Sequence, residues 1–141
     1  MIIKQLSIFL ENRSGRLLEV TELLGKNGLN LSALSLADTA EYGILRLIVS
    51  DPEKALDLLK QNGFSVRLTD VVCLCMPNKA GELAKALKTL SDKNISVEYM
   101  YAFSKGDQSF IVLRTENIEK DVEILSESNL GLLKACDVYN I

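Results

Sequence analysis

Hydrophobic and polar positions alternate along residues 2–10, which predicts a strand with Leu6, Ile8 and Leu10 on one face. Residues 15–27 change to helical spacing, because their apolar positions recur every three or four residues. The change of period predicts that the chain opens with a strand that leads into a helix.

Residues 31–70 complete the first half with two strands around a turn, a second helix and a fourth strand. Asp51 and Pro52 favour a helix start, since Asp caps the first free amides and Pro fits the first turn. The turn is expected at residues 38–41. The remaining predicted elements are strands at 31–37, 42–50 and 64–70 and a helix that ends at Asn62-Gly63.

The second half repeats the first without a gap when the sequence is shifted by 66 positions. Asn12-Arg13-Ser14-Gly15-Arg16-Leu17 then falls on Asn78-Lys79-Ala80-Gly81-Glu82-Leu83, and Gly28-Leu29-Asn30-Leu31 falls on Asn94-Ile95-Ser96-Val97. We therefore expect two domains, residues 1–70 and 71–141. The second half should contain helices near 81–93 and 117–128 and a hairpin turn at 105–107.

Each half has the order strand, helix, strand, strand, helix, strand, which is typical of a ferredoxin-like α+β fold. Its antiparallel sheet carries both helices on one face, and two such units side by side would form an eight-stranded sheet. The expected core rows are Leu45, Leu47 and Val49 in the first half and Ile111, Leu113 and Thr115 in the second.

The opposite face of the first sheet carries Ile44, Arg46 and Ile48, and its counterpart carries Phe110, Val112 and Arg114. These rows are apolar for a surface exposed to water, so we expect a second copy of the chain to cover them. Scattered exposed apolar residues are the simpler alternative, because they are common on soluble proteins.

The composition of the chain reduces the number of possible function classes. The chain has 141 residues, 48% of them hydrophobic, and a net charge of −3. The acidic balance and the lack of a basic cluster speak against nucleic-acid binding. No apolar run approaches the about 20 residues that cross a bilayer, and no leader peptide is evident, so we expect a cytoplasmic protein without membrane contact.

Histidine is absent, which removes the usual proton shuttle and His-activated nucleophiles. Cys73 and Cys75 lie close in sequence, but two thiols without His fall short of a zinc site, so we expect no metal and no cofactor. An acylphosphatase-like enzyme and an RNA-recognition module share the predicted topology. Acylphosphatase-like enzymes are single units that rely on an Arg-bearing phosphate loop, which Arg13 and Arg16 could imitate but Lys79 and Glu82 in the second half do not. RNA-recognition modules need stacking aromatics on the central strands, and residues 43–49 contain none. We therefore expect no enzyme and no RNA binding.

The most informative motif is Asn-x-x-Gly-x-Leu, which stands between the first strand and the first helix of both halves. Glycine at this place permits a positive φ, and the helix start presents amides with partial positive charge that suit a carboxylate. The simpler interpretation is that Asn12 and Asn78 are turn or cap residues.

The residues from Glu11 to Leu17, followed by Gly28-Leu29-Asn30-Leu31-Ser32-Ala33, resemble the ACT domain, a small amino-acid-sensing module of metabolic regulation. The first repeat is similar to the serine-sensing domain of phosphoglycerate dehydrogenases. Two tandem copies account for essentially the whole chain.

The resemblance implies that amino acids bind where two units meet, between the first loop of one unit and the start of the second strand of the other. Asn78 and Asn30 would then complete one pocket, and Asn12 and Ser96 the other. Because Ser96 is shorter than Asn30, the first pocket should bind more tightly. The implied ligand-binding residues are Asn12, Ser14, Gly15, Arg16, Leu17, Asn30, Leu31, Asn78, Ala80, Gly81, Glu82, Leu83, Ser96 and Val97.

These observations predict a non-catalytic regulatory protein that binds a free amino acid and signals to a partner protein. The alternative is a dedicated regulatory subunit of an amino-acid biosynthetic enzyme. In both cases the chain is expected to form a homodimer through the open sheet face or the sheet edges.

Overall fold

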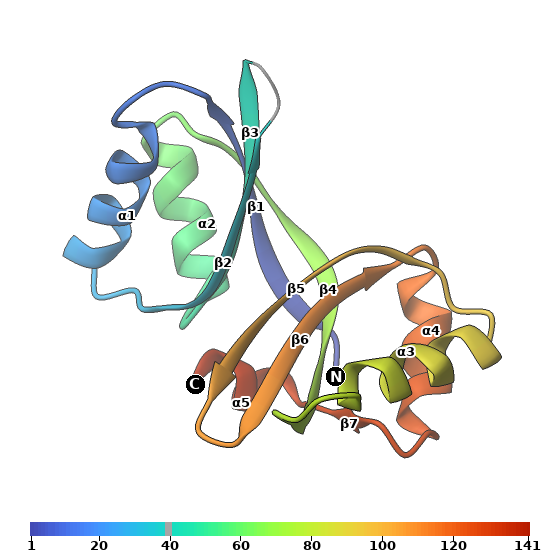
Figure 1. Cartoon of the computed structure of the whole chain (residues 1–141). Coiled ribbons are helices and arrows are strands. Elements are labelled where there is room, and N and C mark those ends of the chain that lie inside the picture. The colour runs from blue at the N-terminus through green and yellow to red at the C-terminus, as the bar shows by residue number, and fades with distance from the viewer. Residues whose placement is uncertain (39–40) are drawn as a thin grey trace. The chain divides into compact units, whose positions relative to one another are not determined.

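The computed structural model describes residues 1–38 and 41–141 (Figure 1). The turn predicted at residues 38–41 therefore lies in part outside the described residues. The elements are β1 Ile3–Glu11, α1 Arg16–Lys26, β2 Leu31–Asp38, β3 Tyr42–Val49, α2 Pro52–Gln61, β4 Ser65–Pro77, α3 Glu82–Asp92, β5 Val97–Lys105, β6 Gln108–Thr115, α4 Ile118–Ser126, β7 Gly131–Leu132 and α5 Ala135–Tyr139.

The chain forms two compact units. The N-terminal unit contains Lys4–Thr69 and the last residues, Val138–Ile141, while the C-terminal unit contains Asp70–Asp137 and Met1–Ile3. Within the N-terminal unit the Lys4 amide donates a 2.7 Å hydrogen bond to the Tyr139 hydroxyl, which attaches the end of the chain to β1. Each unit thus includes a short segment from the far end of the sequence.

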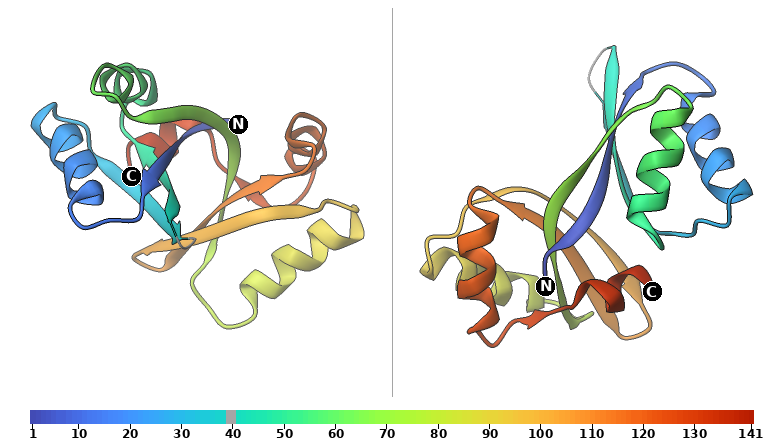
Figure 2. Two further views of the ribbon diagram at one scale, coloured as in Figure 1. Left: turned by 90° about the horizontal axis from the view of Figure 1, so that it is seen from above. Right: turned by 180° about the vertical axis from the view of Figure 1, so that it is seen from behind.

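The N-terminal unit is an antiparallel sheet in the order β2-β3-β1-β4, with α1 and α2 on one face (Figures 1 and 2). Ile8 lies opposite Leu45 and Leu6 opposite Leu47, so these side chains share the face that the helices cover. Both pairs are fully buried. The core row predicted for β3 is therefore confirmed.

The C-terminal unit repeats this arrangement with the order β5-β6-β4 and the short β7 on the other side of β4. Its helices α3 and α4 again cover one face, as both views of Figure 2 show. Leu74 lies opposite Ile111 and packs with Leu90 and Leu125 in the core. Thr115 continues the predicted core row and is fully buried.

The predicted fold class, two ferredoxin-like units of α+β type, is confirmed. The described residues form seven strands instead of eight, because the chain stays extended from Ser65 to Pro77. No Gly, Pro or Asn interrupts residues 65–76. The last strand of the first repeat and the first strand of the second are therefore one strand, β4.

Local signals set the helix ends as predicted. The Asp51 carboxylate accepts a 3.2 Å hydrogen bond from the Lys54 amide, and Pro52 is the first residue of α2. Gly63 follows the helix with a φ of 82°, which a residue with a side chain rarely adopts. Among the described residues, no helix is long and apolar enough to span a membrane.

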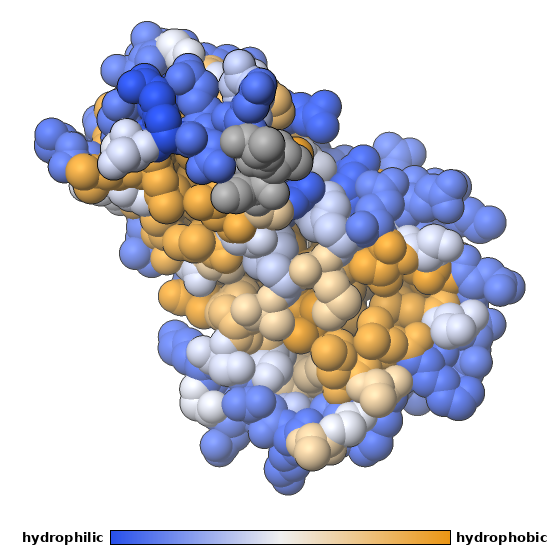
Figure 3. Space-filling model, turned by 45° about the horizontal axis from the view of Figure 1, so that its top comes forward, coloured by the Kyte–Doolittle hydropathy of each residue, from blue (hydrophilic) through white to orange (hydrophobic). Residues whose placement is uncertain are grey.

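Apolar side chains remain exposed on both faces of the N-terminal sheet. Phe9 lies opposite Ile44 on the face without helices, and its ring stacks on that of Tyr42 with centroids 4.8 Å apart. Leu34 lies opposite Leu47 on the helix face, yet it is 52% exposed because β2 is an edge strand. Figure 3 shows apolar surface in more than one region of the face that it presents.

Candidate functional site

The loop before the first helix has the same backbone in both units. Gly15 has φ 90° and ψ −15°, and Gly81 has φ 88° and ψ −13°. This is the left-handed region, in which a Cβ atom is unfavourable, so glycine is required by the turn. Both glycines thus adopt the positive φ that the sequence pattern permitted.

Hydrogen bonds fix the two loops in matching frames. The Asn12 amide donates to the Glu41 carbonyl at 2.7 Å, and the Asn78 amide donates to the Asp107 carbonyl at 2.8 Å. Both bonds tie the loop to the hairpin that follows in the same unit. The repeat identified in the sequence is therefore also a repeat of backbone geometry.

Helices α1 and α3 begin at these loops without a side-chain cap. The first amides of a helix have no partner within the helix and carry partial positive charge. Asn12, Ser14, Asn78 and Ala80 of the preceding loops are exposed. Each loop can therefore present amides and an exposed asparagine to an anionic ligand group.

The second predicted position stands just before the second strand of each unit. Asn30 is exposed, and its backbone exchanges hydrogen bonds with Ser50. Ser96 is also exposed, and its carbonyl accepts from the Glu116 amide at 3.1 Å. The strand residues that follow, Leu31 and Val97, are half-buried.

The two units differ at the first residue of their first helix. The Arg16 guanidinium lies 4.7 Å from the centre of the Phe64 ring and forms an ion pair with Glu19. At the matching position, Glu82 forms an ion pair with Lys85 at 2.7 Å. Leu17 and Leu83, which follow, are exposed apolar residues in both units. Arg16 is therefore occupied by contacts inside its own unit.

Two of the cavities in the described part of the chain adjoin the predicted loops or the strands that lead into them. Asn78 lines a cavity of about 420 Å³ together with Lys79, Asp107 and Gln108. Sequence reasoning missed Asp107 and Gln108 as site residues, although the predicted turn at 105–107 could have indicated them. A cavity of about 270 Å³ in the N-terminal unit, which includes Phe9 and Ile44, contains none of the predicted ligand-binding residues.

The thiols of Cys73 and Cys75 in β4 both have raised pKa values. Burial raises the pKa of the Cys73 thiol to about 12, and the neighbouring Cys75 adds to the rise. Burial also raises the pKa of Cys75, whose Sγ donates to the Gln108 Oε1 atom at 3.3 Å. The described residues contain no group of three or more His, Cys, Asp or Glu side chains placed to hold a metal ion.

Within each unit the predicted residues form two separate groups, the loop before the first helix and the start of the second strand. In the N-terminal unit these groups lie at opposite ends of the sheet, because Glu11 pairs with Tyr42 whereas Leu31 pairs with Val49. The pairing of Asn30 with Asn78, and of Asn12 with Ser96, stays a prediction. These groups offer backbone amides, side-chain amides and the hydroxyls of Ser14 and Ser96, which can bind a polar ligand.

A family model described as ACT domain pair matches residues 1–141. The chain belongs to the ACT domain pair family. The resemblance read from the loop motifs is therefore confirmed. ACT domains are regulatory folds that bind small molecules, and this pair occupies the whole sequence.

Solved structures share the architecture of this ACT domain pair. Protein BT0572 from Bacteroides thetaiotaomicron is 52% identical, with a TM-score of 0.95 over 100% of this chain and 98% of that chain. The regulatory subunit of aspartate kinase from Thermus thermophilus is 12% identical, with a TM-score of 0.66 over 89% and 93%. The corresponding subunit from Thermus flavus is 13% identical, with a TM-score of 0.57 over 89% and 92%.

The similarity to the two aspartate kinase subunits shows the fold alone, because the identities are low. No curated protein matches the sequence of the ACT domain pair.

Proposed function

We propose that this ACT domain pair is a non-catalytic regulatory protein that binds a free amino acid and signals its presence to a partner protein. The observation that carries the proposal is the pair of matching loops, in which Gly15 and Gly81 open a helix that no side chain caps. A helix start of this kind suits the carboxylate of an amino acid.

The ligand's two charged groups need different partners. Backbone amides at the start of α1 or α3 donate to the carboxylate, while an asparagine side-chain oxygen accepts from the ammonium group. We assign one pocket to Asn78 with Asn30 and the other to Asn12 with Ser96. The adjoining backbone comes from Gly15, Arg16 and Leu17 in the first loop and from Gly81, Glu82 and Leu83 in the second. Ser96 reaches less far than Asn30, so the first pocket is the tighter one.

A ligand regulates only if it binds one arrangement of the protein more tightly than another. Binding between a loop of one unit and a strand start of the other would stabilise one mutual arrangement of the two units. The changed surface would then be recognised by the partner protein.

A thermal-shift screen with the twenty amino acids tests the proposal. A ligand at 100 times its dissociation constant should add about 2.7 kcal/mol to the free energy of unfolding. Calorimetric titration of the amino acid that gives the largest shift then measures the two sites. Asn78→Ala should weaken the tighter site, and Asn12→Ala the weaker one.

Asn117→Ala is the matched control, because Asn117 precedes α4 in the C-terminal unit and its side chain forms no capping hydrogen bond. It should leave the titration unchanged. Absence of any shift with all twenty amino acids would contradict the proposal. Equal weakening by Asn12→Ala and Asn78→Ala would contradict the inequality of the sites.

The second candidate is a dedicated regulatory subunit of an amino-acid biosynthetic enzyme. It is favoured by the shared fold with the regulatory subunit of aspartate kinase from Thermus thermophilus, at a TM-score of 0.66. Purification of the tagged full chain from native extract separates the two candidates. Stoichiometric recovery of one enzyme supports the subunit, and recovery of the ACT domain pair alone supports the free-standing sensor.

We also propose that the ACT domain pair acts in the cytoplasm as a homodimer. Five exposed apolar residues support self-association. They are Phe9, Tyr42 and Ile44 on the open sheet face and Leu34 and Leu36 on the β2 edge. Analytical ultracentrifugation of the wild type and of a Leu34→Ser variant tests it: the variant should shift the equilibrium toward monomer.

A further inference from the structure

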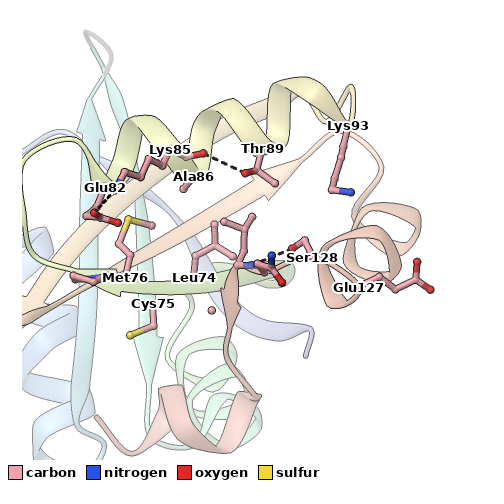
Figure 4. A pocket seen from close by; sticks show the side chains of 14 residues that line it. Leu74, Cys75, Met76, Glu82, Lys85, Ala86, Thr89, Lys93, Glu127 and Ser128 are labelled. Atoms are coloured by element: carbon pink, nitrogen blue, oxygen red, sulfur yellow. Dashed lines mark hydrogen bonds and ion pairs between the residues drawn. The ribbon is translucent and has the colours of Figure 1, made fainter.

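The C-terminal unit contains a cavity of about 540 Å³ that lies between α3 and the segment joining α4 to β7 (Figure 4). We call it the α3 cavity. Leu74, Ala86 and Leu130 contribute apolar side chains to its wall, Thr89 lies on α3 above them, and Lys93 directly follows that helix. All lining residues belong to the C-terminal unit.

The repeat explains why the C-terminal unit has this space. Val20, Leu23 and Phe64 occupy the positions in the N-terminal unit that correspond to Ala86, Thr89 and Leu130. All three larger residues pack in or against the N-terminal core. The second repeat therefore carries a smaller side chain at three positions around one site.

Most polar groups near one end of the cavity already have partners. Glu82 forms its ion pair with Lys85, and the Thr89 hydroxyl donates to the Lys85 carbonyl at 3.2 Å. Ser128 at the opposite wall donates to the Leu125 carbonyl and accepts from the Leu130 amide. These groups make the rim of the cavity polar, and each already has a hydrogen-bond or ion-pair partner within the protein.

Lys93 differs, since its ammonium forms no hydrogen bond or ion pair with any described residue. Figure 4 shows this ammonium on the side of α3 that faces Ser128, whereas the Glu127 carboxylate points away from the cavity. The α3 cavity therefore combines an apolar wall with one cation that has no protein partner.

We propose that the α3 cavity binds a small organic carboxylate with an apolar body. Lys93 binds the carboxylate through a charge-assisted hydrogen bond, while the body packs on Leu74, Ala86 and Leu130. The volume lies within the range of small-molecule sites, about 300–1,000 Å³. Of the residues assigned above to amino-acid binding, only Glu82 lines this cavity, so the proposal does not rest on the proposed function.

Calorimetric titration with octanoate, and with octylamine as a probe of the same length and opposite charge, tests the ligand class. Octanoate should bind, with amide chemical shifts moving at Thr89, Lys93 and Leu130, and octylamine should bind at least tenfold more weakly. Binding of both probes with equal affinity, or no heat and no shift with octanoate at millimolar concentration, would overturn the proposal.

Variants locate the site. Thr89→Leu combined with Leu130→Phe installs the side chains of the N-terminal unit and should weaken octanoate binding more than tenfold. Lys93→Gln should weaken it about tenfold, because it removes the charge and retains a similar length. Lys88→Gln is the control: Lys88 lies on α3, five residues before Lys93, but pairs with Asp92 at 2.8 Å, and octanoate affinity should not change.

Circular dichroism establishes whether each variant folds. If the double variant does not fold, Lys93→Gln against Lys88→Gln decides, and equal affinities of these two variants would refute the site. A variant with both Asn12→Ala and Asn78→Ala should still bind octanoate. Loss of octanoate binding in that variant would place the carboxylate at the loops instead of the α3 cavity.

Discussion

The two units keep the same loop backbone but differ in the side chains beneath their first helices. Gly15 and Gly81 have φ values of 90° and 88°, whereas Phe64 and its counterpart Leu130 differ in size and surroundings. Arg16 stacks over Phe64, but Glu82 at the matching position pairs with Lys85. A duplicated fold can thus retain one loop conformation while the side chains behind it change.

The largest effect is expected where only one unit has no room for a side chain. A Cβ atom at Gly131 would lie 2.4 Å from the Cys75 carbonyl oxygen, whereas its counterpart Ser65 already carries a side chain and is exposed. Gly131→Ala should lower the free energy of unfolding by about 3 kcal/mol. Urea denaturation measures it.

Ser65→Ala is the control and should change the stability by less than about 0.5 kcal/mol. Equal effects of the two substitutions would show that β7 can shift away from Cys75 without a loss of stability. The two units would then not differ at this position.

The loop glycines should respond alike. Gly15→Ala and Gly81→Ala each place a Cβ atom at a φ near 90° and should each cost about 1–2 kcal/mol, since neither site has other atoms within 4 Å. Thermal unfolding of both variants measures the costs. Gly25→Ala in α1 should instead stabilise by about 0.5–1 kcal/mol, because alanine favours a helix. A difference above about 1 kcal/mol between the two loops would break their equivalence.

The contact of Arg16 with Phe64 should contribute a smaller amount, because it is a single cation–π pair. Phe64→Leu installs the residue of the C-terminal unit and should destabilise by about 1 kcal/mol. A double-mutant cycle with Arg16→Gln should give a coupling of about 0.5–1 kcal/mol. Zero coupling would show that Phe64 stabilises the fold only through the apolar surface that it buries and not through its contact with Arg16.

The smallest expected effect concerns pH and belongs to the C-terminal unit. Cys73 has its pKa raised from 9.0 to about 12, while its counterpart Ser7 bonds to Thr69 and does not ionise in this range. The unfolded thiol loses its proton above pH 9 and the folded thiol retains it, so stability falls as pH rises between those values. At pH 9.5 the loss is about 0.8 kcal/mol.

Denaturation at pH 8 and pH 9.5 measures this loss in the wild type and in Cys73→Val, which should reduce it to the part that Cys75 contributes, since burial raises the pKa of that thiol too. Cys136→Ser should retain it, because Cys136 is exposed. The same pH dependence in Cys73→Val as in the wild type would assign the loss to other groups.

Much of the fold could be read from the sequence because its signals are local. Asp51 with Pro52 predicted the start of α2, and the periodicity of residues 42–50 predicted which side chains face the core. The loop glycines could be read too, since only the left-handed backbone gives glycine an advantage there. These features depend on a residue and its near neighbours.

The partners of the site residues could not be read in this way. Arg16 and Phe64 lie 48 positions apart, and the repeat alone gives no sign that they stack. Asp107 and Gln108 join Asn78 in one cavity only because β4 pairs with β6 in the register that sets Pro77 opposite Gln108. Such contacts require a packed sheet.

The sequence by itself therefore determined the duplicated α+β plan, the loop conformations and the family, because turn chemistry and apolar periodicity are written in consecutive residues. The tertiary structure decided that β4 runs unbroken through both repeats and that the α3 cavity lies where Ala86, Thr89 and Leu130 converge. The physical reason is that a cavity is a sum of side-chain volumes from several elements, which no single stretch of sequence contains.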